Sequence, residues 1–91
     1  MPTGRWAEVK ALVGEARYDA LIDARGLSCP LPLVKARQAL MVLPAGARVC
    51  VLATDPAAPR DFEEFADVTG HELVEQRVED GVHLLVMVKG G

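Results

Sequence analysis

Aromatic side chains and long hydrophobic runs are scarce in this 91-residue chain, and each shortage excludes a class of protein. Aromatic residues make up only 4% of the sequence, so valine, leucine and alanine must fill the core. No apolar run approaches the roughly 20 residues that a helix needs to cross a bilayer, so we expect no membrane contact. The first residues also lack the apolar stretch of an export signal, which leads us to expect a cytoplasmic protein with reduced thiols.

The few cysteines and histidines form no recognisable metal or redox pattern. Cys29 and Cys50 are far apart and form no Cys-x-x-Cys pair, and with His71 and His83 they lack the spacing of a zinc site. There is also no glycine-rich phosphate loop and no Ser-His-Asp arrangement. We therefore predict no cofactor and no metal. Cys50 is expected to be inert and packed, His71 to cap or hydrogen-bond, and His83 to be a surface or packing residue.

The composition fits one small soluble domain. Hydrophobic residues make up 51% and charged residues 25% of the chain. A chain of this length buries on the order of 60–65% of its unfolded surface, which leaves little room for an enclosed active site. The formal net charge of −3 argues against nonspecific nucleic-acid binding, which needs a basic face. No direct nucleic-acid contact is therefore expected.

The most informative feature is Cys29, which stands directly before a predicted helix. Pro30 and Pro32 follow it, and proline suits the first helical turn because its missing N–H would have no partner there. Gly26 permits a tight turn ahead of the cysteine. The unpaired N–H groups and the dipole of a helix N-terminus favour a thiolate, so we expect a lowered pKa for Cys29.

The hydrophobic periodicity predicts a β-α-β-α-β-β order. Apolar residues at spacings of three and four indicate the helices, alternating runs indicate strands, and Asp80-Gly81 between two such runs is a strong hairpin signal. This order predicts a two-layer α/β (α+β) sandwich, in which two helices cover one face of a mixed four-stranded sheet. The predicted elements are strands at 18–23, 48–53, 72–79 and 82–88, and helices at 31–42 and from about Asp55 or Pro59 to Gly70.

Alternation along the last strand predicts which of its residues face the core. We expect Val82, Leu84, Val86 and Val88 to face the core, and His83, Leu85 and Met87 to lie on the opposite face together with Cys50 and Leu52. Such an apolar face needs a cover.

Trp6, Val9, Leu12 and Val13 approximate a helical stripe over residues 5–15. This stripe predicts an extra helix that packs near the sheet or mediates dimer contacts, with an unstructured tail as the alternative.

Three blocks in this order resemble the TusA/SirA family of small sulfur-carrier proteins. The first is Asp23-x-Arg25-Gly26-Leu27-x-Cys29-Pro30-x-Pro32, which matches the Cys-Pro-x-Pro signature and its lead-in. The others are Ala53-Thr54-Asp55-Pro56 with Asp61-Phe62, and Gly70-His71-Glu72-Leu73. The resemblance divides the chain into an N-terminal extension over residues 1–18 and a TusA-like carrier domain over residues 19–91.

The resemblance implies that Cys29 carries sulfur as a persulfide. The donor would be a cysteine desulfurase or a rhodanese-like enzyme, and the recipient a protein of tRNA thiolation, molybdenum-cofactor maturation or sulfur oxidation. Such a protein is a sulfurtransferase-type carrier rather than an independent multiple-turnover enzyme, and a monomer or weak dimer. Arg25 and Lys35 are the candidates for stabilising the sulfur anion, with partner docking or solubility as alternatives. Gly26, Pro30 and Pro32 would support the thiol.

Two other functions compete with the carrier. A noncatalytic protein- or RNA-binding regulatory module would depend on Arg25 or Lys35 and not on Cys29. A peroxide or thiol sensor would need a resolving partner for Cys29, and no second cysteine lies nearby in the sequence. Asp55 and Asp61 are expected to cap and orient the second helix rather than to act as acid or base.

Overall fold

The computed structural model describes residues 18–91 and confirms the predicted order of elements. The first strand differs from the prediction, because it starts two residues later and ends one residue later. The helix expected over residues 5–15 lies outside the described residues. In chain order the elements are β1 (Ala20–Ala24), α2 (Leu31–Val42), β2 (Arg48–Ala53), α3 (Ala58–Thr69), β3 (Glu72–Glu79) and β4 (Val82–Val88).

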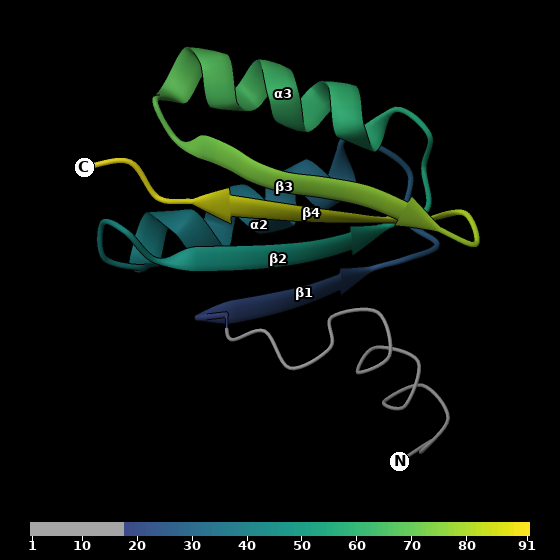
Figure 1. The fold of residues 1–91 in the computed structure, drawn as a ribbon, viewed down its shortest axis with the longest axis horizontal. Helices are drawn as coiled ribbons and strands as arrows, with labels where there is room; N and C mark the ends of the chain where they lie inside the picture. Colours follow the sequence, from purple (N-terminus) through teal and green to yellow (C-terminus); the bar gives the residue numbers. More distant parts are fainter. Residues whose placement is uncertain (1–17) are drawn as a thin grey trace.

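The four strands form one mixed sheet in the order β1-β2-β4-β3 (Figure 1). β1 and β2 are parallel and are joined by α2, while β4 runs antiparallel to both β2 and β3. Parallel neighbours require such a crossover, whereas β3 and β4 need only a tight hairpin. Asp80 and Gly81 both have positive φ angles, +50° and +78°, as a two-residue hairpin turn requires.

Both helices pack on one face of the sheet. Ala36 and Leu40 of α2 and Ala58 and Phe62 of α3 are buried in a single cluster with apolar strand residues. The strand residues that face them are Ala24, Val49, Val51, Ala53, Leu85 and Met87. This is the predicted two-layer α+β sandwich.

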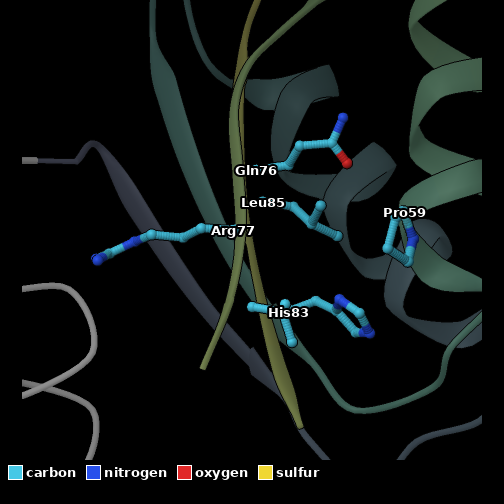
Figure 2. A pocket seen from close by; sticks show the side chains of 6 residues that line it. Pro59, Gln76, Arg77, His83 and Leu85 are labelled. Carbon is cyan, nitrogen blue, oxygen red and sulfur yellow. The ribbon is translucent and has the colours of Figure 1, made fainter. Parts of the chain in front are cut away.

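The orientation predicted for β4 is wrong. Leu85 and Met87 point into the helix-covered core, because they pair with Val51 and Val49 of β2. Figure 2 shows the same alternation on β3, where Gln76 points toward α3 and Arg77 points to the other side of the sheet. Alternation along a strand shows which residues share a face, but not which face the helices cover.

A second apolar cluster therefore lies on the side of the sheet away from the helices. It consists of Cys50, Leu52, Leu84 and Val86, all of them at most 1% exposed. Cys50 pairs with Val86 and Leu52 with Leu84, so the two β2 residues share their face with these β4 residues and not with Leu85 and Met87. We call these four residues the second cluster.

The helix-covered side also contains a small pocket between the start of α3 and strands β3 and β4. Its volume is about 190 Å³, and Pro59, Gln76, His83 and Leu85 line it (Figure 2). His83 is thus a partly buried packing residue, as predicted. Within residues 18–91, none of the helices is long and apolar enough to span a membrane. No group of three or more potential metal-ligating side chains gathers in this part of the chain either.

Candidate functional site

The loop between β1 and α2 holds Cys29 at one edge of the sheet. A turn closes where the Leu27 N–H donates to the Ala24 carbonyl at 3.2 Å. Gly26 occupies this turn with φ of +83°, a value that residues with a Cβ rarely adopt. Cys29 is partly exposed, and its buried part packs against the helix-side core.

Pro30 occupies a different position from the one predicted, whereas Pro32 lies in the first helical turn as expected. Pro30 is the N-cap residue, with φ of −94° and ψ of 17°, and so lies outside the helix rather than in its first turn. Its carbonyl accepts the first helical hydrogen bond, from the Val34 N–H at 2.9 Å. Pro32 is buried in the first turn of α2, where its missing N–H has no cost. Cys29 therefore stands one residue ahead of the cap.

The segment that follows β2 anchors the Cys29 loop. The Asp55 Oδ2 atom accepts a hydrogen bond from the Cys29 N–H at 3.0 Å, and its Oδ1 atom accepts one from the Ala57 N–H at 2.8 Å. The Thr54 Oγ1 atom accepts one from the Gly26 N–H at 2.9 Å. The two hydrogen bonds that Asp55 accepts, from the N–H groups of Cys29 and Ala57, lower the pKa of its carboxyl group. Asp55 thus joins the thiol loop to the start of α3.

The role of Thr54 and Asp55 at the loop was missed in the sequence, although a signal for it exists. The carboxyl ends of parallel neighbouring strands meet at the same edge of a sheet. Since β1 and β2 are parallel neighbours, the residues that follow β2 must lie beside the loop that follows β1. Asp55 and Asp61 were expected to cap α3, but its N-cap residue is Ala57 and no side chain forms a cap hydrogen bond. Asp55 instead accepts hydrogen bonds from the Ala57 N–H, just before α3, and from the Cys29 N–H.

The prediction of a lowered pKa for Cys29 is wrong. Partial burial, a hydrogen bond to the Asp61 carboxylate, and the negative charges of Asp61 and Asp55 raise the pKa of this thiol to about 11. Burial, and after it the two carboxylates, outweigh the helix N-terminus, whose effect is small and falls off within one turn. Asp61 lies in the first turn of α3, so the second helix supplies a carboxylate that adds to the effect of burial on the Cys29 pKa.

Arg25 and Lys35 are placed differently from each other. The guanidinium of Arg25 forms a two-pronged ion pair with Asp23, at 2.8 Å from Nε to Oδ1 and 2.9 Å from Nη2 to Oδ2. Lys35 is exposed on α2. Among the described residues, the charges that act on the Cys29 thiol are those of Asp61 and Asp55, and neither cation contributes.

A groove of about 390 Å³ runs between α2 and α3 beside the thiol loop. It is lined by Pro30 from the thiol loop, by Leu33 from α2, and by Asp61, Glu64, Phe65 and Val68 from α3. Leu31 and Val34, at the start of α2, are also 49% and 41% exposed. Cys29, the chain neighbour of Pro30, thus lies beside an apolar surface with an acidic border, which can receive a side chain of another protein.

The remaining candidates have structural positions. Cys50 is fully buried in β2, as predicted for a packed cysteine, and burial raises the pKa of its thiol to about 11. The His71 Nδ1 atom accepts a hydrogen bond from the Gly90 N–H at 2.9 Å, which confirms the hydrogen-bonding role expected for it. His71 also stacks beside Phe65, with ring centroids 5.7 Å apart.

These features define a class of protein: a small α+β domain that presents one thiol on an anchored loop before a helix. Comparisons with known proteins agree with this class. The family model for sulfurtransferase TusA matches residues 20–89. The sulfur carrier protein TusA of Allochromatium vinosum is 43% identical over 72 residues, which are 78% of this chain and 95% of that protein.

Two further relatives give the same result. The sulfur carrier protein TusA of Pseudomonas savastanoi pv. phaseolicola is 44% identical over 66 residues, 72% of this chain and 79% of that protein. The crystal structure of a SirA-like protein from Desulfitobacterium hafniense superposes with a TM-score of 0.69 at 31% identity, over 79% of this chain and 99% of that one. The chain therefore belongs to the TusA family, as the sequence blocks around Cys29 indicated.

Proposed function

We propose that this protein is a sulfur carrier in a sulfur relay, and that Cys29 carries sulfane sulfur as a persulfide. One observation carries the proposal: a partly exposed thiol lies beside an apolar groove, on a loop that the hydrogen bond from the Cys29 N–H to Asp55 anchors. Such a site needs no enclosed pocket, because both the donor and the acceptor bring their own reactive groups. The names of the relatives, sulfur carrier protein TusA, support the same function.

The transfer step balances without an external oxidant or reductant. The Cys29 sulfur attacks the outer sulfur of a persulfide on the donor, so that a new S–S bond forms and the donor's S–S bond breaks. The thiol proton, which the Asp61 carboxylate accepts in a hydrogen bond, ends on the departing donor sulfur. Donor persulfide and Cys29 thiol thus become donor thiol and Cys29 persulfide. Delivery to the acceptor follows the same exchange in the opposite direction.

The partners follow from this chemistry. A cysteine desulfurase or a rhodanese-like enzyme forms a persulfide and is a suitable donor, and the acceptor serves tRNA thiolation, molybdenum-cofactor maturation or sulfur oxidation. We place the relay in the cytoplasm, where reducing conditions keep the two free cysteines as thiols. Because every sulfur that leaves must be replaced by the donor, the protein is a carrier and not an independent multiple-turnover enzyme.

The supporting residues have separate proposed roles. Gly26 gives the turn its left-handed residue, Pro30 ends the loop at the cap, and Pro32 packs the first turn of α2. Arg25 stabilises the end of β1 through its pair with Asp23. Lys35, exposed on α2, is available to an acidic group of a partner.

Intact-mass measurement tests the proposal. Reduced protein is incubated with cysteine and a cysteine desulfurase, and in parallel with thiosulfate and a rhodanese. We expect the mass of one sulfur atom to be gained by the parent protein and by a Cys50→Ser control, and no gain by Cys29→Ser with an unchanged circular dichroism spectrum. Loading of Cys29→Ser would refute the role of Cys29. Failure of the parent with both donors would favour a binding module instead.

A further inference from the structure

The sulfur site does not explain why the second cluster is buried. Cys50, Leu52, Leu84 and Val86 are buried, yet α2 and α3 both pack on the other face of the sheet. Among the described residues, the hydrophobic side chains packed against this cluster are those of Tyr18 and Val82. These two lie at the ends of their segments and are only partly buried themselves.

We propose that residues 5–15 form an amphipathic helix that covers the second cluster, with Trp6, Val9, Leu12 and Val13 against the sheet. The four residues repeat at the spacing of one helical face, and Ala11 falls on the opposite side. The proposal concerns the side of the sheet remote from the α2–α3 groove, and it does not depend on sulfur transfer.

The position of Tyr18, where the described residues begin, supports residues 5–15 as the cover of the second cluster. Tyr18 packs against the second cluster, and its side chain hydrogen-bonds to Cys50. Its ring also lies under the guanidinium of Arg48, 5.8 Å from the ring centroid. The chain therefore enters β1 from the cluster side of the sheet, and the residues before Tyr18 start from that side.

The dimensions and the charges also fit. A helix of eleven residues is about 16 Å long, and the span from β1 across β2 to β4 is about 10 Å. On the β3 side the apolar surface ends at charged residues, because Glu75, Arg77 and Glu79 pair with Val86, Leu84 and Val82 on this face. Arg77 forms ion pairs with both glutamates, at 3.4 and 3.7 Å. These charges limit the cover to β1, β2 and β4.

The comparisons set this segment apart from the carrier domain. The family model starts its match at residue 20, and the Allochromatium vinosum relative is covered over 95% of its length by 78% of this chain. The proposed cover is thus a feature of this chain beyond the region it shares with the family model. It would keep the second face from partners and leave the groove beside Cys29 open.

Two reporters in the full chain test the proposal. In a Cys29→Ser background Cys50 is the only thiol, and Trp6 is the only tryptophan. We expect Trp6 to emit at the short wavelengths of a buried indole, and Cys50 to resist a small maleimide. Leu12→Asp should shift the emission toward that of exposed tryptophan and raise the labelling rate of Cys50 at least tenfold. Ala11→Asp, which adds the same charge off the stripe, should change neither.

Three results would overturn it. The first is an exposed-type Trp6 emission in the parent, and the second is an equal Cys50 labelling rate in the parent and Leu12→Asp. The third is Cys50 protection that falls on dilution together with dissociation of a dimer, which would assign the cover to a second copy. Circular dichroism and the urea midpoint of each variant separate loss of the cover from global unfolding, since unfolding would expose Cys50 in any case.

Discussion

Replacement of Asp61 by asparagine should make the Cys29 thiol more reactive. In the native protein the pKa of this thiol is raised to about 11, chiefly by burial and then by the hydrogen bond and charge of Asp61. At pH 7 only about 0.01% of such a thiol is ionised. The variant removes the charge of Asp61 and keeps the burial and Asp55, so we expect the pKa to fall to about 10.

The rate change follows from two opposing effects. A fall of one pH unit in the pKa raises the thiolate fraction about tenfold. The less basic thiolate is also a weaker nucleophile, by about threefold for a Brønsted slope of 0.4–0.5. The net expectation is a three- to fourfold faster reaction of Cys29 with a small disulfide at neutral pH.

Stopped-flow exchange with a small aromatic disulfide measures this rate, and thiolate absorbance over a pH series gives the pKa itself. Both measurements use a Cys50→Ser background, because the pKa of the buried Cys50 thiol is also raised to about 11 and its thiolate would absorb in the same pH range. Asp67→Asn on the exposed side of α3 is the matched control, since it removes the same charge from the same helix away from the thiol. An Asp61→Asn protein with an unchanged pKa and rate, or one that matches Asp67→Asn, would refute the assignment of Asp61.

Three further predictions concern the loop and the core. Asp55→Asn should make the stability of the fold less sensitive to acid. The pKa of Asp55 is lowered in the fold, so its stabilisation is present above about pH 4 and is lost as the pH falls through the lowered value. Urea midpoints over a pH series measure this dependence. Gly26→Ala should cost about 1–2 kcal/mol in the free energy of unfolding, because its φ of +83° is strained for alanine; a melting temperature equal to that of the parent would contradict this. Phe62→Ala, at a fully buried position, should cost about 3–5 kcal/mol and unfold a substantial fraction of the protein at growth temperature, as calorimetry would show.

Features that depend on neighbours in the sequence were predicted well. The bounds of α2, β2, β3 and β4 agree with the structure, because hydrophobic periodicity and turn residues act locally. Asp80 and Gly81 have the positive φ angles of the expected hairpin turn, and Gly70 ends α3 in the left-handed conformation. The Cys29 run also indicated the family, which the comparison over residues 20–89 confirms.

The sequence alone thus determined the order of the elements, the position of the thiol before α2 and the family. The tertiary structure decided which face of β4 the helices cover, because alternation is symmetric until another element packs against one side. It also decided the electrostatics of the thiol. Asp55 and Asp61 are far from Cys29 along the chain, and only the parallel pairing of β1 with β2 and the packing of α3 bring their carboxylates to it. Local sequence indicated an activated thiol, whereas burial and these distant charges raise its pKa.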